Sequence, residues 1–295
     1  MFLLMLSIFR RSVFLLTGLS FLGAVGTQFL TVPTSGQELA LGPQVSAPNL
    51  NSVNPALLAT RSNTPEINFT YGQWLADSRT STFYAAWPTS FGYGGLRARY
   101  LETRGLELRT NTPTDAPLAQ FGAFGVTVEA LASWSTGPLT MGSAVRLITM
   151  EVYTESSTGF ALDLGVNRVF TKHLTFGASV LNLGTMSPLE TKVPQLPLRF
   201  LIGGSYQREM PAFSHTVYIT GEWSSQVAGG ILLIGGSTQW QQLTVQLSTR
   251  LSQKVVAIGS GFGFRWGIYE LHYGIQFGSQ GLGLPQSLDI AIRLP

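Results

Sequence analysis

The sequence predicts an all-β protein, a transmembrane antiparallel β-barrel of about fourteen strands with an N-terminal plug segment. Two features of the chain predict this class. Asp, Glu, Lys and Arg make up only 11% of the 295 residues, less than half of the roughly 25% found in average soluble domains. Segments of about ten residues also place apolar side chains on one face and polar residues or glycine on the other, as a wall between lipid and a polar lumen requires.

The first 26 residues are expected to be a cleaved secretory signal. Arg10 and Arg11 precede an apolar run from Val13 to Ala24, and small residues precede an expected cut before Thr27. An uncleaved anchor is the alternative, but this run is well short of the ~20 residues that span a bilayer as a helix. The paired arginines also resemble a twin-arginine leader, which carries folded cargo rather than an unfolded chain. The signal predicts export.

The alternation of apolar and polar residues is clearest toward the C-terminus. In residues 243–251, Leu243, Val245 and Leu247 share one face, and polar residues occupy the other. Extending this pattern backward gives fourteen segments: 66–74, 79–88, 92–101, 119–132, 139–150, 158–168, 172–182, 197–207, 216–223, 228–238, 243–251, 255–265, 269–277 and 287–294. The faces expected to contact lipid include Leu243, Val245, Leu247, Tyr273, Ile275, Ile290 and Ile292.

The spacing of these segments predicts the domain organisation. Residues 27–64 lack alternation and are expected to form the plug, with one helix near 51–60, while residues 65–295 form the barrel. The three longest connections, 102–118, 183–196 and 278–286, fall on one side of the membrane if strands alternate in direction, as in barrels with long external loops and short periplasmic turns. Tryptophans near strand ends are expected in interfacial girdles: Trp74, Trp87, Trp223, Trp240 and Trp266.

Candidate chemistry is sparse in this sequence. There is no cysteine, the three histidines show no metal-ligand spacing, and no cofactor motif is present. His272 is predicted to face the lumen beside Glu270 and Gln276, so a lumenal hydrolase is conceivable, but polar lumens need such residues for packing. The sequence therefore predicts no catalytic, metal or cofactor site. Eighteen Lys and Arg against 15 Asp and Glu leave no basic patch for nucleic acid.

Charged residues of both signs are predicted on the lumen faces. A mixed set favours cross-lumen ion pairs and plug contacts over a selectivity ring, which would carry one sign. The candidate lumen network is Arg97, Arg99, Glu222, Arg250, Glu270, His272, Asp289 and Arg293, and Glu129, Arg146, Asp163 and Arg199 occupy similar positions. Gly259, Gly261 and Gly263 share one face of a strand, which leaves room there for the plug or for an apolar ligand.

The N-terminal part contains three motifs: Ala40-Leu41-Gly42, Asn54-Pro55-Ala56-Leu57-Leu58 and Trp74-Leu75-Ala76-Asp77. In these motifs the chain resembles the PorV/PorQ family of outer-membrane proteins. The resemblance extends to Leu181-Asn182-Leu183-Gly184-Thr185, which is similar to a recurrent strand of the family. It implies a fourteen-stranded barrel related to FadL, the long-chain fatty acid channel. It also implies that Asn54, Pro55 and Ala56 lie in a segment folded inward.

The resemblance further implies a role and a place for the protein. It predicts a multi-pass barrel in the outer membrane of a Gram-negative-type bacterium, surrounded by outer-membrane lipid and lipopolysaccharide. It also predicts a non-enzymatic, partner-binding component of type IX protein secretion or surface attachment, whose partners are secretion-machinery or cargo proteins. Loops 102–118 and 183–196, which mix apolar and charged residues, would be the partner surface. The alternative is a FadL-like transporter of hydrophobic small molecules.

Overall fold

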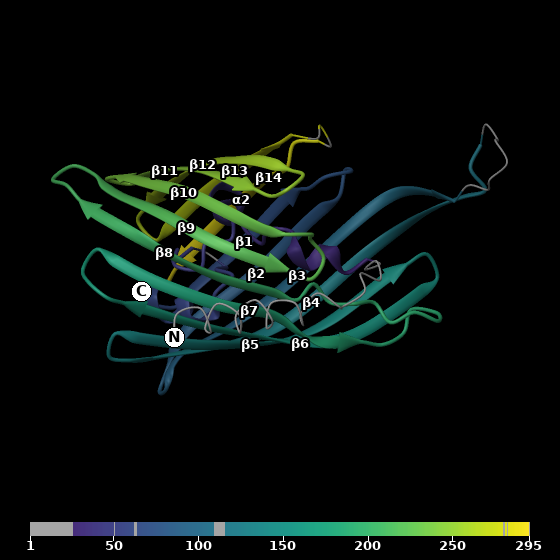
Figure 1. Ribbon diagram of the computed structural model, residues 1–295, viewed down its shortest axis with the longest axis horizontal. Coiled ribbons are helices and arrows are strands. Elements are labelled where there is room, and N and C mark those ends of the chain that lie inside the picture. Colours follow the sequence, from purple (N-terminus) through teal and green to yellow (C-terminus); the bar gives the residue numbers. More distant parts are fainter. Residues whose placement is uncertain are drawn as a thin grey trace, which may run out of the picture.

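The fold is a closed antiparallel barrel (Figure 1). The computed structural model describes residues 26–49, 51–61, 64–108, 116–279, 281 and 283–294, so the predicted leader lies outside the described residues except for Gly26. Within this part, fourteen strands pair with their sequence neighbours, and β1 pairs with β14 to close the wall. The predicted fold class is confirmed.

The strands follow the predicted segments closely, with differences mainly in length. Their bounds are β1 Glu66–Gln73, β2 Arg79–Thr89, β3 Gly92–Leu108, β4 Ala119–Thr136, β5 Leu139–Val152, β6 Glu155–Val169, β7 Leu174–Met186, β8 Arg199–Glu209, β9 Ser214–Ser224, β10 Gly230–Trp240, β11 Leu243–Leu251, β12 Val256–Trp266, β13 Tyr269–Gly278 and β14 Gln286–Arg293.

Each strand separates an apolar outer face from a largely polar inner face. In β1 the side chains of Glu66, Asn68 and Thr70 are buried in the lumen, while Ile67 and Phe69 are exposed. This inverts the burial of a soluble protein, because lipid covers the outer face. The residues expected to contact lipid all lie on that face, either exposed or partly exposed: Leu243, Val245, Leu247, Tyr273, Ile275, Ile290 and Ile292.

The wall is taller on one side. Strands β3 to β7 have 13 to 18 residues, whereas β8 to β14 have 8 to 11. The shorter length is about what a tilted strand needs to cross a bilayer. The expected loop 102–118 is therefore partly wrong, because β3 continues to Leu108. The segments joining even-numbered strands to the next strand are short turns, such as 137–138 and 241–242. We call their end periplasmic and the opposite end outer.

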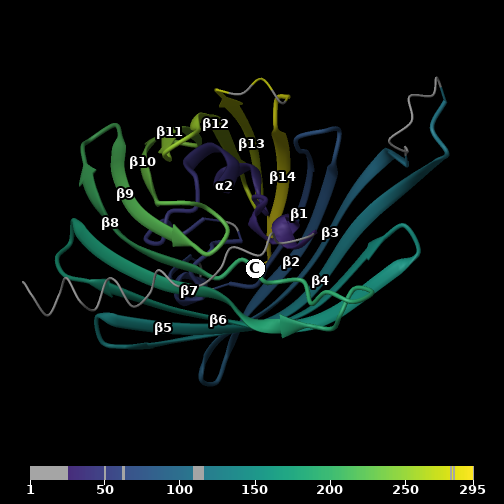
Figure 2. The same cartoon turned by 45° about the vertical axis from the view of Figure 1, so that its right-hand side comes forward.

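The N-terminal segment lies inside the wall, as Figure 2 shows for the purple helix α2. Its helices are η1 Thr27–Thr31, α2 Gly36–Leu41, η2 Pro55–Leu57 and α3 Leu58–Arg61. The expected helix 51–60 is confirmed only from Pro55 onward, where a 3₁₀ turn leads into one short helical turn. Among the described residues, no helix has both the length and the apolar character needed to cross a membrane.

Glycines on the inner face let the wall approach this segment. A Cβ at Gly165 would collide with the Asn54 side chain, and one at Gly142 with the Pro55 backbone. On the other side of the barrel, a Cβ at Gly259 or Gly261 would collide with Ala40 of α2. The space predicted at that strand is therefore filled by the N-terminal segment, and Gly263 leaves room for His272.

Most of the tryptophans expected at the interfaces are exposed. The exposed ones are Trp87, Trp223, Trp240 and Trp266. Trp74 is the exception, because it is partly buried and packs against a lumenal cluster that contains Phe29 and Met150. The girdle assignment of Trp74 is therefore wrong. Its position after the end of β1, in the connection 74–78, turns the ring inward over the lumen.

The strand register makes a quantitative prediction for β11. Leu247 is 59% exposed at mid-strand on the outer face, whereas Thr244 is half-buried on the inner face. We expect Leu247→Arg to lower the free energy of unfolding by about 2–4 kcal/mol, because the guanidinium would enter hydrocarbon. Thr244→Arg, with its side chain in the polar lumen, is expected to change it little. Urea unfolding in lipid vesicles measures both, and equal losses would contradict the register.

Candidate functional site: the lumen

The wall strands β13 and β14 hold the N-terminal end of α2. The backbone N–H groups of Gly36 and Gln37 donate to the two Asp289 carboxylate oxygens, at 2.8 and 3.2 Å. The Thr70 hydroxyl also donates to Asp289, at 2.8 Å. A carboxylate at the amino end of a helix accepts its free N–H groups and interacts favourably with its dipole. Asp289 therefore fixes the N-terminal segment to the wall.

His272 belongs to the same attachment. Its Nε2 lies 2.6 Å from Glu270 Oε1, and the Gln37 side-chain amide lies 2.9 Å from the same nitrogen. Arg293 Nη2 contacts Glu270 at 2.7 Å. His272 thus contacts a carboxylate of the wall and a side-chain amide of the N-terminal segment. Among the described residues, no group of three His, Asp or Glu is placed to hold a metal ion.

The Asn54-Pro55-Ala56 motif forms a second attachment. The Asn54 side chain accepts the N–H of Ala56 at 3.1 Å, which caps η2. Its amide donates to the Val45 carbonyl at 2.8 Å and to the wall carbonyl of Val166 at 3.0 Å. Asn54 is fully buried, so each of these bonds replaces one that water would otherwise make. The three residues therefore hold a turn against β6.

A chain of buried ion pairs crosses the inner face of β3 to β6. Arg97 contacts Glu129 at 2.5 Å, Arg146 contacts Glu129 at 2.8 Å, and Arg146 contacts Asp163 at 2.7 Å. Arg146 also binds the Asn182 side chain. Arg97 donates to the carbonyl of Asn51 at 3.5 Å, so the chain of charges reaches the N-terminal segment.

The other predicted lumen residues occupy similar positions. Arg99 donates to the carbonyl of Val32 at 2.6 Å, and Arg199 pairs with Glu222 at 2.7 Å. Arg97, Arg99, Glu222, Glu270, His272 and Asp289 are buried in the lumen, while Arg250 and Arg293 are partly buried. The structure thus places all eight on inner faces. Glu270, His272, Asp289 and Arg293 lie at the Asp289 attachment, Arg97 lies in the arginine–carboxylate chain, and Glu222 pairs with Arg199.

Above the ion pairs, the lumen becomes apolar at its outer end. A cavity of about 370 Å³ lies between η1, the connection 74–78 and strands β3 to β5. Its lining includes Phe29, Trp74, Leu101, Ala123, Met150 and Val152. Phe29, Leu101 and Met150 are each less than 10% exposed and belong to one apolar cluster. We call this cavity the outer chamber. It can hold a small apolar molecule, because apolar walls with few polar groups are the usual composition of such sites.

The connection 187–198 packs from the β7 side against the apolar cluster that borders the chamber. Leu196 is buried in the same cluster, and the Thr27 hydroxyl donates to the carbonyl of Gln195 at 2.6 Å. Met186 is also buried there, so two apolar residues of the expected partner loop 183–196 face the lumen instead. Val193 is 53% exposed. The part of loop 102–118 at residues 109–115 lies outside the described residues.

Sequence reasoning missed the outer chamber, although a signal for it exists. The inner face was expected to be mostly polar, yet inner positions of β5 change from Arg146 to Ile148 and Met150. Leu147 on the outer face is also apolar, so apolar residues are consecutive at Leu147 and Ile148 and the alternation stops there. A stretch where alternation stops inside a strand indicates an apolar lumen at that depth.

Comparisons with known proteins support the fold. No family model matches the chain, and no curated protein matches it. Among solved structures, the toluene transporter TodX of Pseudomonas putida superposes with a TM-score of 0.59 at 9% identity, covering 88% of this chain and 96% of that one. The monoaromatic hydrocarbon channel CymD gives 0.59 at 8% identity, covering 93% and 98%. The chain therefore has the fold of FadL-like outer-membrane channels.

Proposed function

We propose that this protein is an outer-membrane channel for hydrophobic small molecules. The observation that carries the proposal is the outer chamber, a cavity with a mostly apolar lining at the outer mouth of the lumen. A polar solute would gain nothing from such walls, whereas an apolar one would leave water at a gain of about 25 cal/mol per Å². The similar structures are described as hydrocarbon and toluene channels, which supports the same class of substrate.

The wall is unpaired near the apolar cluster that borders the chamber. Pairing of β7 with β8 stops at Leu181 and Arg199, although β7 continues to Met186. The segment 187–198 lies at this unpaired edge, where the carbonyl of Pro197 accepts the Asn182 side-chain amide at 2.9 Å. An apolar molecule that displaces this segment reaches the membrane without crossing the ion pairs below.

Filling the chamber tests this function. Ala123 lines the chamber from the inner face of β4, and Val126 points outward from the same strand. We expect Ala123→Trp to weaken displacement of a fluorescent apolar probe by toluene at least about tenfold, because the indole occupies the cavity. Val126→Trp serves as the matched control and is expected to bind like the parent protein. Equal displacement in both variants would contradict the proposal.

A role in type IX secretion is a second proposal, which rests on the resemblance of the N-terminal motifs to the PorV/PorQ family. Asn54, Pro55 and Ala56 would then shape the lumenal segment, and the outer part of β3 and β4 would contact secreted partners. Glu102 and Arg104 form an ion pair of 2.9 Å in the outer part of β3, and the Arg104 side chain is exposed. This pair supports a position of the outer part of β3 outside the membrane. Co-purification of the full-length protein from its own outer membrane tests this role, and recovery without secretion partners would contradict it.

A further inference from the structure

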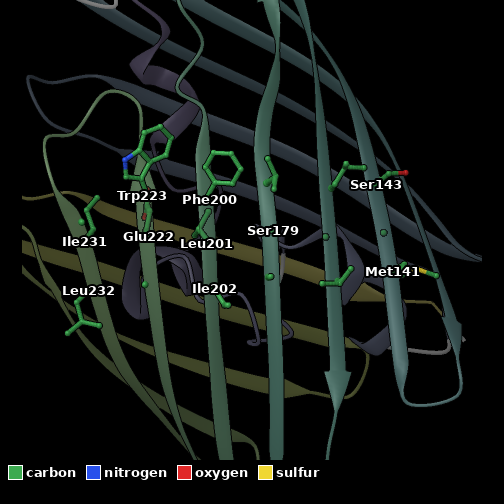
Figure 3. A pocket seen from close by; sticks show the side chains of 18 of the residues that line it. Met141, Ser143, Ser179, Phe200, Leu201, Ile202, Glu222, Trp223, Ile231 and Leu232 are labelled. Carbon is green, nitrogen blue, oxygen red and sulfur yellow. The ribbon is translucent and has the colours of Figure 1, made fainter. Parts of the chain in front are cut away.

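A large hollow lies on the outer face of the barrel, away from the lumen. Figure 3 shows it in front of the wall, with the N-terminal segment behind. Its volume is about 1030 Å³, and its rim includes the outward side chains of Phe200, Ile202, Trp223 and Leu232. We call it the outer groove. No charged side chain on the outer face lines it, because Glu222 points inward to Arg199.

The outer groove crosses the wall along the hydrogen-bonding direction. One row of paired residues runs through it, in the order Trp134, Met141, Val166, Ala178, Ile202, Gly221, Leu232 and Leu251. These residues lie on β4 to β11, so the row spans about 34 Å at ~4.8 Å per strand. In strands tilted by about 35–45°, that row covers roughly 20–25 Å of depth, close to the apolar band of such barrels.

The floor of the outer groove consists of small outward residues. Ser143, Ala178, Gly221 and Gly230 lie there. A Cβ at Gly221 would have only the Ile202 carbonyl oxygen nearby, at 3.9 Å, so this position is open toward the membrane. Phe200 and Trp223 form one wall, with ring centroids 5.5 Å apart. The groove is thus apolar, and its floor is unobstructed at Gly221.

The N-terminal segment lies directly behind part of the outer groove. Gly142 and Gly165 line the groove and also receive Pro55 and Asn54 on their inner side. Without side chains at these two positions, the wall lies directly on the Asn54-Pro55 turn. The outer groove and the buried motif are therefore opposite faces of one thin part of the wall.

We propose that the outer groove is a binding site for the acyl chains of membrane lipids. Its walls are apolar, its depth range is that of the hydrocarbon core, and water is absent there, so hydrocarbon must fill it. An acyl chain held between Phe200, Trp223 and the small floor residues makes more contacts with the protein than an acyl chain on a convex wall. This site is separate from the outer chamber and does not depend on the transport proposal.

The test places one larger side chain on the floor of the outer groove. Gly221→Leu places an isobutyl group in the groove, and Gly236→Leu places one at an outward position of β10 outside it, where a Cβ is equally free at 3.8 Å from the nearest atom. Both proteins are reconstituted with 1-palmitoyl-2-oleoyl-phosphatidylcholine, extracted in mild detergent and examined by native mass spectrometry. We expect Gly221→Leu to retain at least one phosphatidylcholine fewer than Gly236→Leu and the parent protein.

Two results would overturn the proposal. Equal lipid retention by both variants would show that the groove holds no lipid beyond the general annulus. A parent protein that is dimeric, and that Gly221→Leu converts to a monomer without loss of lipid, would assign the groove to a second copy. Heat-modifiable mobility in a gel checks that both variants insert as barrels, so a failure to fold is recognised independently.

Discussion

Replacing Arg146 by methionine is expected to cause the largest loss of stability of any single substitution considered. Arg146 joins Glu129 and Asp163, and the side chains of all three are less than 10% exposed. Removing the shared cation leaves a carboxylate in a buried site without its partner, which costs about 3–5 kcal/mol in measured cases. Methionine keeps much of the volume, so the loss reports charge rather than a cavity.

The matched control is Arg104→Met. Arg104 pairs with Glu102, but its side chain is 74% exposed, and exposed ion pairs contribute about 0–1 kcal/mol. Urea unfolding of both variants in lipid vesicles, followed by tryptophan fluorescence, gives the comparison. If the two substitutions lowered the unfolding free energy equally, the buried chain of charges would contribute no more than a surface pair.

Deleting residues 28–50 is expected to open the barrel to ions. A fourteen-stranded barrel is too wide for its own side chains to fill, and the described part of this segment contacts the wall through Asp289, Arg99 and Ser248. The strands pair with each other independently of it, so the wall should still insert. Planar-bilayer recordings should show open steps for the deleted protein and none for the parent protein.

The control for the deletion is a check that the barrel wall still forms. Circular dichroism and heat-modifiable mobility in a gel should match those of the parent protein, since the closing pair β1–β14 lies outside the deleted residues. Unchanged conductance of a correctly inserted barrel would contradict the view that residues 28–50 close the lumen.

The strands could be predicted because lipid contacts one face of each strand and the polar lumen contacts the other, so consecutive residues alternate in polarity. Val245 and Gln246 are neighbours with opposite burial, and the sequence shows that difference directly. The charged lumen residues followed from the same alternation, since an arginine such as Arg97 can be accommodated only on the inner face. The extension of β3 past Leu101 was missed because its outer part leaves the membrane, where charged residues such as Glu102 and Glu107 are tolerated on either face.

The sequence predicted that the N-terminal segment lies in the lumen, but it did not predict the helices and contacts of that segment. Helix α2 has six residues, and its start is held by Ser35 locally and by Asp289 from the far end of the chain. A helix this short is not stable by propensity alone, so its existence depends on contacts that local sequence patterns do not contain. The outer chamber likewise depends on η1 meeting β5, where Phe29 and Met150 come together from distant segments.

Uptake of a labelled hydrocarbon tests the central claim most directly. Cells whose outer membrane limits entry would express the parent protein, Ala123→Trp or Val126→Trp, and the initial rate of radiolabelled toluene uptake would be measured at equal barrel levels. We expect the parent protein and Val126→Trp to raise the rate above that of cells without the barrel, and Ala123→Trp to abolish this gain. A rate that the parent protein does not raise, or that Ala123→Trp leaves unchanged, would contradict transport through the outer chamber.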